Sequence, residues 1–414
     1  MLALLKKLGP GLLFAGAAIG VSHLVQSTRA GADFGLGLLW ALLLVNLFKY
    51  PFFQFGPRYA SATGETLLEG YRKLGRGILI VYFILNLAVM FTIQTAVTIV
   101  TAGLANSFFG DISFLNFGIE SISSVEIWTI IILCLCLFIL FLGKYSTLDK
   151  LIKVIIIILT ISTLVAVYFA FTEFDAPLTY TQIFPDSKVE IVFLIAFMGW
   201  MPAPLDISVW HSIWAIEKKN DEATFSPQNA LLDFNIGYIG AIILGIAFMC
   251  LGYFVMFNTG ETFSNKAAIF SNQLIDLYTK SLGNWAYIII GIAAFTTMFS
   301  TTITTLDASP RVMSKTLEIL LNKTYKNGYL SWILILTIGT IIIFFAFASE
   351  MGLLIKIATI LSFVTAPFYA IINYRLISSK YTPKIWRPNL ALHILSWAGI
   401  LFLISFSVWY LSIL

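Results

Sequence analysis

Charged residues are scarce in this 414-residue chain, and their scarcity excludes most classes of soluble protein. Only 11% of the residues are Asp, Glu, Lys or Arg, whereas 59% are hydrophobic and the mean hydropathy is +0.91. Soluble domains carry about 25% charged and about 45–50% apolar residues. The composition therefore predicts a membrane protein with the lipid bilayer as its main partner. The net charge of +4 indicates no nucleic-acid partner, because the basic residues lie in short segments between apolar runs.

Cysteine and histidine are also rare, with three residues of each type. The cysteines Cys134, Cys136 and Cys250 all lie within apolar segments, so they predict neither a disulfide framework nor a cysteine-type zinc site. The chain also lacks a nucleophile–base arrangement and a cofactor-binding motif. We therefore expect neither an enzyme nor a bound cofactor. We expect no cleavable signal peptide, because Met1–Lys7 leads directly into a long apolar segment.

Long apolar segments are the main feature that the sequence does contain. A bilayer core about 30 Å thick needs about 20 apolar residues per helix, and eleven segments approach or exceed that length. They span residues 10–32, 36–54, 78–105, 125–143, 150–172, 189–214, 234–258, 284–306, 329–348, 351–376 and 390–413. We predict an all-α membrane protein with eleven transmembrane helices. The polar stretch 259–283 between two of them is long enough for a short surface helix.

The basic residues predict the orientation of these helices. With the N terminus in the cytoplasm, most of the 25 Lys and Arg residues fall in the inner loops, as the positive-inside rule requires. An odd number of helices then places the C terminus outside. We expect an integral protein of a bacterial inner membrane. The sequence carries no signal of an oligomeric state.

Two of the apolar segments are interrupted near their middle. Segment 10–32 is interrupted at Ile19–His23, and segment 189–214 is interrupted at Met201–Pro204. A membrane helix leaves backbone groups unpaired only where they line a cavity or bind a ligand, because lipid cannot satisfy them. Paired broken helices are typical of secondary transporters, whose substrate site lies between the two breaks near the bilayer midplane.

Each interrupted helix begins a set of five helices. Because five is odd, the second set enters the membrane from the opposite side, which predicts an inverted 5+5 repeat. We expect one transporter domain over residues 1–414. It contains a first repeat at 1–172, an inverted repeat at 187–376 and an extra helix at 390–413.

The two breaks supply the residues that we predict to bind the cargo. They are Gly20, Ser22, His23, Gln26, Met201, Ala203, Pro204 and Asp206. The imidazole of His23, the thioether of Met201 and the carboxylate of Asp206 are the predicted metal ligands. A carboxylate at membrane depth is costly unless it is paired or hydrated. Asp206 therefore either binds a cation or proton or caps the half-helix that follows it, and His23 is either a ligand or a hydrogen-bonded packing residue.

Prolines in the second break are expected to leave backbone oxygens unpaired. Pro202 and Pro204 have no N–H group, so the carbonyl groups that they would have bonded become available to a cation.

Three further residues are predicted to lie on a proton path or to act in gating. They are Arg29, His211 and Lys356. A lysine within a membrane helix is costly when it is unpaired. Lys356 therefore either replaces the charge of a bound cation or pairs with a carboxylate, Asp206 or Asp307.

Short motifs along most of the chain resemble one known family in order and spacing. They are Gly9-Pro10-Gly11 with Ala30-Gly31, Leu38–Leu44 followed by Thr63–Leu67, Met201-Pro202, Ser300–Thr304, and Ala366-Pro367-Phe368. Together they resemble the natural resistance-associated macrophage protein (Nramp) family. The resemblance implies the fold of the amino acid–polyamine–organocation superfamily and transport of divalent metal, commonly driven by protons.

The resemblance is incomplete at the metal site. The family's first-helix motif Asp-Pro-Gly-Asn is Gly20-Val21-Ser22-His23 here, so the metal-binding Asp is absent. In the second break Met201 is kept, but Ala203-Pro204 replaces the family's His-Asn.

Two functions therefore stay open. The first is a proton-coupled transporter of divalent metal cations. The second is a transporter of a small organic solute, such as an amino acid or a carboxylate, attracted by the positive half-helix N termini together with Arg29 and His23. A membrane sensor is disfavoured, because the chain contains no soluble signalling domain.

Overall fold

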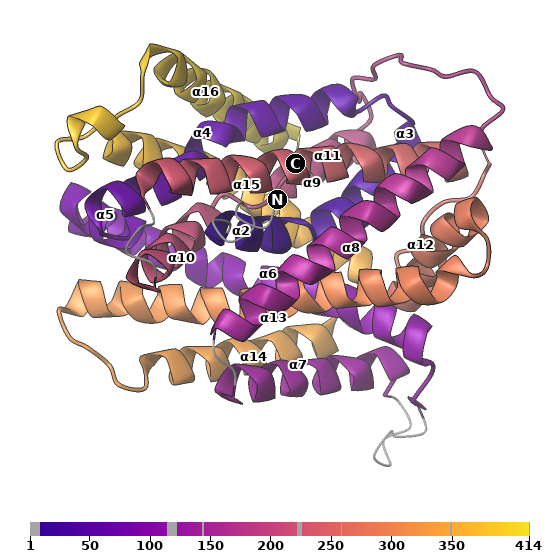
Figure 1. Cartoon of the computed structure of the whole chain (residues 1–414), viewed down its shortest axis with the longest axis horizontal. Helices are drawn as coiled ribbons and strands as arrows, with labels where there is room; N and C mark the ends of the chain where they lie inside the picture. The colour runs from indigo at the N-terminus through magenta and orange to yellow at the C-terminus, as the bar shows by residue number, and fades with distance from the viewer. Residues whose placement is uncertain are drawn as a thin grey trace.

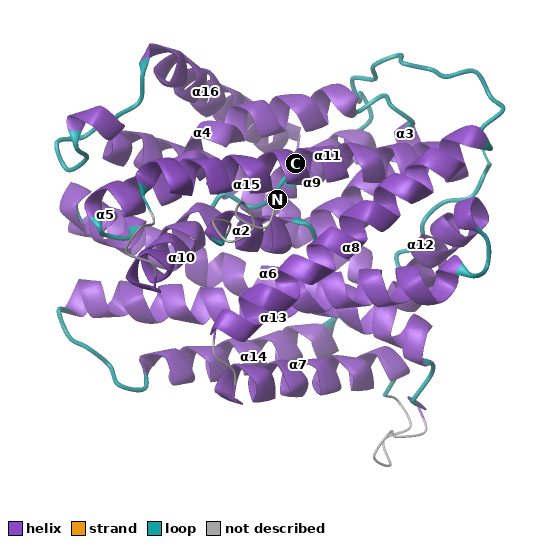
Figure 2. Ribbon diagram, viewed as in Figure 1, coloured by secondary structure: helices purple, strands orange, loops and turns teal. Residues whose placement is uncertain are grey.

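Helices form nearly all of the chain that the structure describes (Figure 2). The structure is a computed structural model, and it describes residues 9–113, 122–142, 145–221, 226–257, 259–347 and 350–413. Met1–Lys7, where we expected no cleavable signal, lies outside the described residues.

Each predicted apolar segment coincides with a helix or with a broken helix. The unbroken helices are α4 (Leu39–Thr63), α6 (Arg76–Phe109), α7 (Ser124–Leu142), α8 (Tyr145–Thr172), α11 (Pro227–Met256), α13 (Ala286–Leu321), α14 (Gly328–Ala346), α15 (Met351–Ile377) and α16 (Leu390–Ile413). The first broken helix consists of α2 (Pro10–Ala18), the π-helix η1 (Ser22–Ser27) and α3 (Thr28–Phe34). The second consists of α9 (Lys188–Trp200) and α10 (Ile207–Asp221). The all-α prediction is confirmed.

Three shorter helices lie between these elements. They are α5 (Leu67–Leu74), α12 (Ala267–Leu282) and the 3-10 turn η3 (Lys384–Trp386). The short helix expected within residues 259–283 is therefore α12. Within the described residues, seven helices are long and apolar enough to cross a membrane, and the bent pair at the start of the chain makes an eighth. Among the other predicted spans, α4 contains Lys49 and Arg58, and α9 and α10 are each short.

The broken helices lie in the interior of the bundle (Figure 1). Helices α7 and α14 pack side by side along one edge, and α16 packs on α4 at the opposite edge. Large apolar side chains are exposed on these peripheral helices, for example Phe138, Ile338 and Leu401. Such side chains can face lipid without cost, so the distribution of burial agrees with an integral membrane protein.

Helix α11 holds the first broken helix in place through very close backbone contact. A Cβ atom added at Gly11 would lie 2.1 Å from the carbonyl oxygen of Asp233, and one added at Gly237 would lie 2.0 Å from the carbonyl oxygen of Gly11. Small residues allow this approach between membrane helices. The Asp233 carboxylate also accepts hydrogen bonds from the backbone N–H of Gly9, at 3.1 Å, and of Gly11, at 2.7 Å. It therefore caps the positive N terminus of α2 from a neighbouring helix.

Candidate transport site between the two helix breaks

The first break lies where the sequence predicts it. Helix α2 ends at Ala18, η1 begins at Ser22, and the two halves meet at an angle of 46°. A Cβ atom at Gly20 would lie 2.9 Å from Oγ1 of Thr301, so α13 approaches the break too closely for a larger residue. The Ser22 hydroxyl donates a hydrogen bond of 2.6 Å to the carbonyl oxygen of Ala18 and satisfies one of the groups that the break frees.

The second break also agrees with the prediction. Helix α9 ends at Trp200 and α10 begins at Ile207, so residues 201–206 cross the interior outside any helix. Lipid could not supply hydrogen-bond partners for the backbone groups of this segment.

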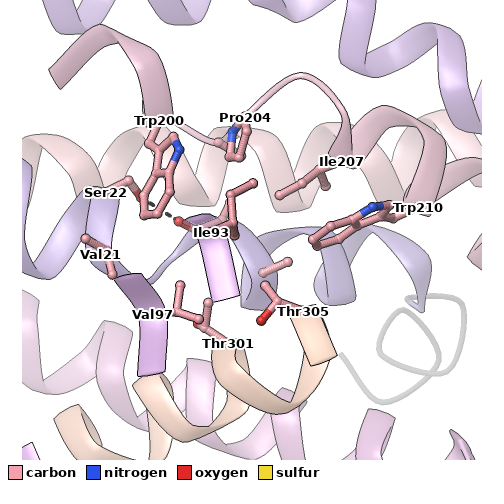
Figure 3. Close-up of a pocket in the computed structure, with 13 residues that line it drawn as sticks. Val21, Ser22, Ile93, Val97, Trp200, Pro204, Ile207, Trp210, Thr301 and Thr305 are labelled. Atoms are coloured by element: carbon pink, nitrogen blue, oxygen red, sulfur yellow. Dashed lines mark hydrogen bonds between the residues drawn. The ribbon is translucent and has the colours of Figure 1, made fainter. Parts of the chain in front are cut away.

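A small buried cavity lies between the two breaks. Its volume is about 20 Å³, enough for about one water molecule. The residues that line it are Ala17, Ala18, Val21, Ser22, Ile93, Val97, Trp200, Ala203, Pro204, Ile207, Trp210, Thr301 and Thr305. The two tryptophans lie on either side of Pro204 and Ile207, and the two threonines of α13 face them (Figure 3). Of the eight residues predicted to bind cargo, Ser22, Ala203 and Pro204 line this cavity.

His23 is held by hydrogen bonds on both ring nitrogens. Its Nε2 lies 2.9 Å from the carbonyl oxygen of Ala241 on α11, and its Nδ1 lies 2.7 Å from the Ser22 hydroxyl. Because a carbonyl oxygen only accepts, Nε2 donates. The single hydrogen of the Ser22 hydroxyl goes either to Nδ1 of the neutral ring or to the carbonyl oxygen of Ala18. A metal ion at His23 would therefore require one of these hydrogen bonds to break.

Met201 also faces α11. A Cβ atom at Gly245 would lie 3.3 Å from the Met201 sulfur, and Met201 is absent from the residues that line the cavity. Within the described residues, no three His, Cys, Asp or Glu side chains converge as a metal site would require. The three predicted metal ligands, His23, Met201 and Asp206, thus have different neighbours in the structure.

Asp206 is buried at the start of α10, with 2% of its surface exposed. Its carboxylate lies beside the backbone N–H groups of Asp206 and Ile207 and interacts electrostatically with Lys49 of α4. The two roles predicted for Asp206 are compatible with this position, since a capping carboxylate at a break still faces the break.

Lys356 pairs with neither Asp206 nor Asp307 among the described residues, so the pairing alternative is wrong. Asp307 accepts a hydrogen bond of 2.7 Å from Arg311, one turn further along α13, and Lys49 is the cationic neighbour of Asp206. The cation that reaches carbonyl groups at the second break is a side chain of the protein itself. The Lys49 ammonium group lies 2.8, 2.7 and 3.3 Å from the carbonyl oxygens of Met198, Gly199 and Ala203.

Lys49 is therefore the site residue that sequence reasoning missed. A signal was present, because Lys49 is a charged residue in the middle of an apolar segment. Its partners could not be read from the sequence, because they lie about 150 positions away along the chain.

Gln26, Arg29 and Lys356 come together at a second cavity of about 320 Å³, which Glu350 and Asn265 also line. The Arg29 guanidinium donates hydrogen bonds to the carbonyl oxygen of Ser264, at 2.6 Å, and to Oδ1 of Asn265, at 3.2 Å. Arg29 thus joins the first broken helix to the segment before α12. Gln26 lies at this second cavity and is absent from the lining of the central one.

His211 lies in an aromatic cluster rather than at either cavity. Its ring stacks on Phe14 at 5.7 Å and contacts Phe234. Neither ring nitrogen has a hydrogen-bond partner within the described structure.

Comparisons with known proteins agree on the architecture. Residues 11–412 match the family model described as natural resistance-associated macrophage protein-like. An uncharacterized protein of Pasteurella multocida is 36% identical over 415 residues, covering 98% of this chain and 92% of that protein.

Solved structures share the fold at lower sequence identity. A mutant of the manganese transporter of Eremococcus coleocola superposes with a TM-score of 0.74 at 14% identity, covering 98% of this chain and 85% of the other. The nucleobase-cation-symport-1 family transporter Mhp1, with bromovinylhydantoin bound, superposes with a TM-score of 0.62 at 16% identity, covering 97% and 92%. At these identities the likeness shows the fold. The family match over nearly the whole chain shows that this protein belongs to the natural resistance-associated macrophage protein-like family, whose members are transporters and not enzymes.

Proposed function

We propose that the protein is a secondary active transporter that carries its cargo by alternating access through the cavity between the two helix breaks. The cavity touches both broken helices, and every residue that lines it is buried. On one side of it Arg29 holds α3 against the segment before α12. On the other side Arg311 of α13 lies 3.7 Å from Glu217 of α10. An alternating-access cycle passes through a closed intermediate. In that intermediate the site is buried and a contact holds the helices together on each side of it.

We propose a divalent metal cation as the cargo. The observation that carries this proposal is Asp206, a buried carboxylate in the second break whose neighbours Pro204 and Ile207 line the cavity. The hydroxyl groups of Ser22 and Thr301 add neutral oxygens at the same cavity. Carboxylate and hydroxyl oxygens suit hard divalent ions such as Mg²⁺ and Mn²⁺. Family membership and the fold shared with a manganese transporter support the same cargo.

His23 and Met201 belong to this proposal as ligands only of a rearranged site. Each would have to turn from α11 toward the cavity, and His23 would lose a hydrogen bond in doing so. In its present form the cavity offers the hydroxyl oxygens of Ser22, Thr301 and Thr305, and the Asp206 carboxylate lies next to the lining residue Ile207.

A small organic solute is the second candidate cargo, favoured by the walls of the cavity. Trp200, Trp210 and Ile93 present large apolar surfaces toward it (Figure 3). Binding sites for small organic molecules are mostly apolar and aromatic, with a few polar groups that fix orientation. A transporter of the same fold holds a hydantoin derivative.

Uptake by the purified full-length protein in proteoliposomes distinguishes the two cargoes. We expect saturable uptake of Mn²⁺ or Mg²⁺, detected with a metal-sensitive dye inside the vesicles. Asp206→Ala should lower the apparent affinity by about tenfold or more, which corresponds to about 1.4 kcal/mol of lost binding free energy. Asp276→Asn, on the exposed face of α12, is the matched control and should leave uptake unchanged.

Absence of uptake of either ion by folded protein would overturn the metal proposal. Amino acids and organic acids would then be tested as cargo directly, with metal salts as the non-competing control. An imposed pH gradient in the same vesicles tests the proton coupling that we propose from the family. We further propose a bacterial inner membrane, with the N terminus in the cytoplasm, as the setting.

A further inference from the structure

The most unusual buried group of the described structure is the ammonium group of Lys49. The side chain is 0% exposed and reaches from α4 to the end of α9. An ammonium group has three N–H donors, and three carbonyl oxygens lie within 2.7–3.3 Å of it. All three donors can therefore be used at the same time, which a charge inside a membrane protein requires.

The acceptors are carbonyl groups that the helix break leaves without partners. In a continuous helix the carbonyl of Met198 would bond the N–H of residue 202, but Pro202 has none. The carbonyl of Gly199 would bond the N–H of Ala203, but α9 ends at Trp200. Lys49 thus occupies acceptors that exist only because α9 is broken.

The negative charges around this position also favour a cation there. The C-terminal end of a helix carries a partial negative charge, and both Met198 and Gly199 lie in the last turn of α9. The Asp206 carboxylate, at the other end of the break, interacts with the same ammonium group. The break therefore binds one positive charge with oxygen atoms on several sides.

We propose that Lys49 is a built-in cation that fills an oxygen-lined cation site at the break between α9 and α10, where a diffusible monovalent cation would otherwise be needed. The side chain keeps the broken helix in its present arrangement without any dissolved ion. This inference goes beyond the proposed function and does not depend on the identity of the cargo.

Removing the side chain should convert the filled site into an empty one that small cations can enter. In Lys49→Ala, ethylammonium or Na⁺ should raise the Tm of the full-length protein in detergent in a saturable manner, by about 2 °C or more. Lys49→Met keeps most of the side-chain volume without the charge, so it should lose stability and show no response. The parent protein should not respond either, because its site is filled.

Two controls make the result specific. N-methylglucamine carries the same charge but is too large for the space, so it should not stabilise Lys49→Ala. Lys356→Ala removes another lysine placed within a predicted span, one that lines the second cavity, and should create no ethylammonium response. Equal responses of Lys49→Ala and the parent, or a Lys49→Met variant as stable as the parent, would overturn the proposal.

A second measurement applies if Lys49→Ala does not yield folded protein. Asp206→Asn removes the opposite charge, so it should lower the Tm of the parent more than it lowers the Tm of Lys49→Met. Equal losses in both backgrounds would mean that the two charges do not act together, and would refute the built-in cation. These readouts need no cargo, so failure of the metal proposal and failure of this one are distinguishable.

Discussion

At the scale of single residues, Asp233 shows how one buried carboxylate can position a broken helix. It accepts hydrogen bonds from the backbone of Gly9 and Gly11, more than 200 positions earlier in the chain. The first turn of a helix has N–H groups without intrahelical partners. A carboxylate on α11 supplies acceptors for two of them, so the entrance angle of α2 depends on a residue of the second half of the protein.

Asp233→Ala should therefore destabilise the protein by about 2 kcal/mol or more, because hydrogen bonds to a charged group are each worth about 1.5–3 kcal/mol. Asp233→Asn should lose less, since its amide oxygen can still accept one bond. Thermal unfolding in detergent measures both. Asp276→Asn is again the matched control. An Asp233→Ala variant with the Tm of the parent would contradict the capping role.

The same scale shows what could be predicted about the site. Pro202 and Gly20 identify the two breaks, because proline and glycine act on their own backbone and so leave a local signal. The hydrogen bonds of His23, by contrast, depend on Ala241, 218 positions away. Spacing along the chain contains no information about which neighbouring helix a buried side chain contacts. The breaks were therefore predictable, whereas the partners of Lys49 and His23 were not.

At the scale of elements, Arg29 joins the first broken helix to the segment before α12. Its guanidinium donates hydrogen bonds to Ser264 and Asn265 and lies 5.3 Å from the centre of the Phe270 ring. Because α3 continues the half of the broken helix that follows the cavity, this contact fixes that half to the segment before α12.

Arg29→Gln should weaken that contact and expose the second cavity more often. The readout is the labelling rate of a single cysteine at Ala196, which lines this cavity, by a membrane-impermeant maleimide. The background carries alanine at the three native cysteines. We expect labelling to become several-fold faster than in the parent.

The matched control for Arg29→Gln is Lys280→Gln. It breaks an exposed ion pair of 3.0 Å with Glu261 in the same region around α12 but does not touch a broken helix. Exposed pairs contribute little to stability, so labelling should stay at the parental rate. Equal acceleration in both variants would show that Arg29 acts only through general loosening of the outer loops.

At the scale of the whole molecule, hydropathy alone predicted the helical architecture. Helices such as α7, α14 and α16 carry long apolar runs because lipid surrounds much of their surface. The same rule is weaker for interior elements. Helix α4 carries Lys49 and Arg58, and it could be recognised as a span only because the remainder of its first half is apolar. The spans in the interior of the bundle hold the polar residues, and the same spans form the site.

The distribution of basic residues predicts the orientation of the bundle. An odd number of spans with the basic loops inside places the N terminus in the cytoplasm and the C terminus outside. A C-terminal alkaline phosphatase fusion, active only outside the inner membrane, should therefore be active in a bacterial host. A C-terminal green fluorescent protein fusion exported in unfolded form should stay dark.

Fusions made after residue 380, in the basic segment between α15 and α16, are the matched controls and should give the opposite pattern. This segment contains Lys380, Lys384 and Arg387, so the positive-inside rule places it in the cytoplasm. A fluorescent fusion at the C terminus would place both ends of the chain on the same side. An even number of crossings would then be required, and the inverted repeat with one appended helix could not be correct.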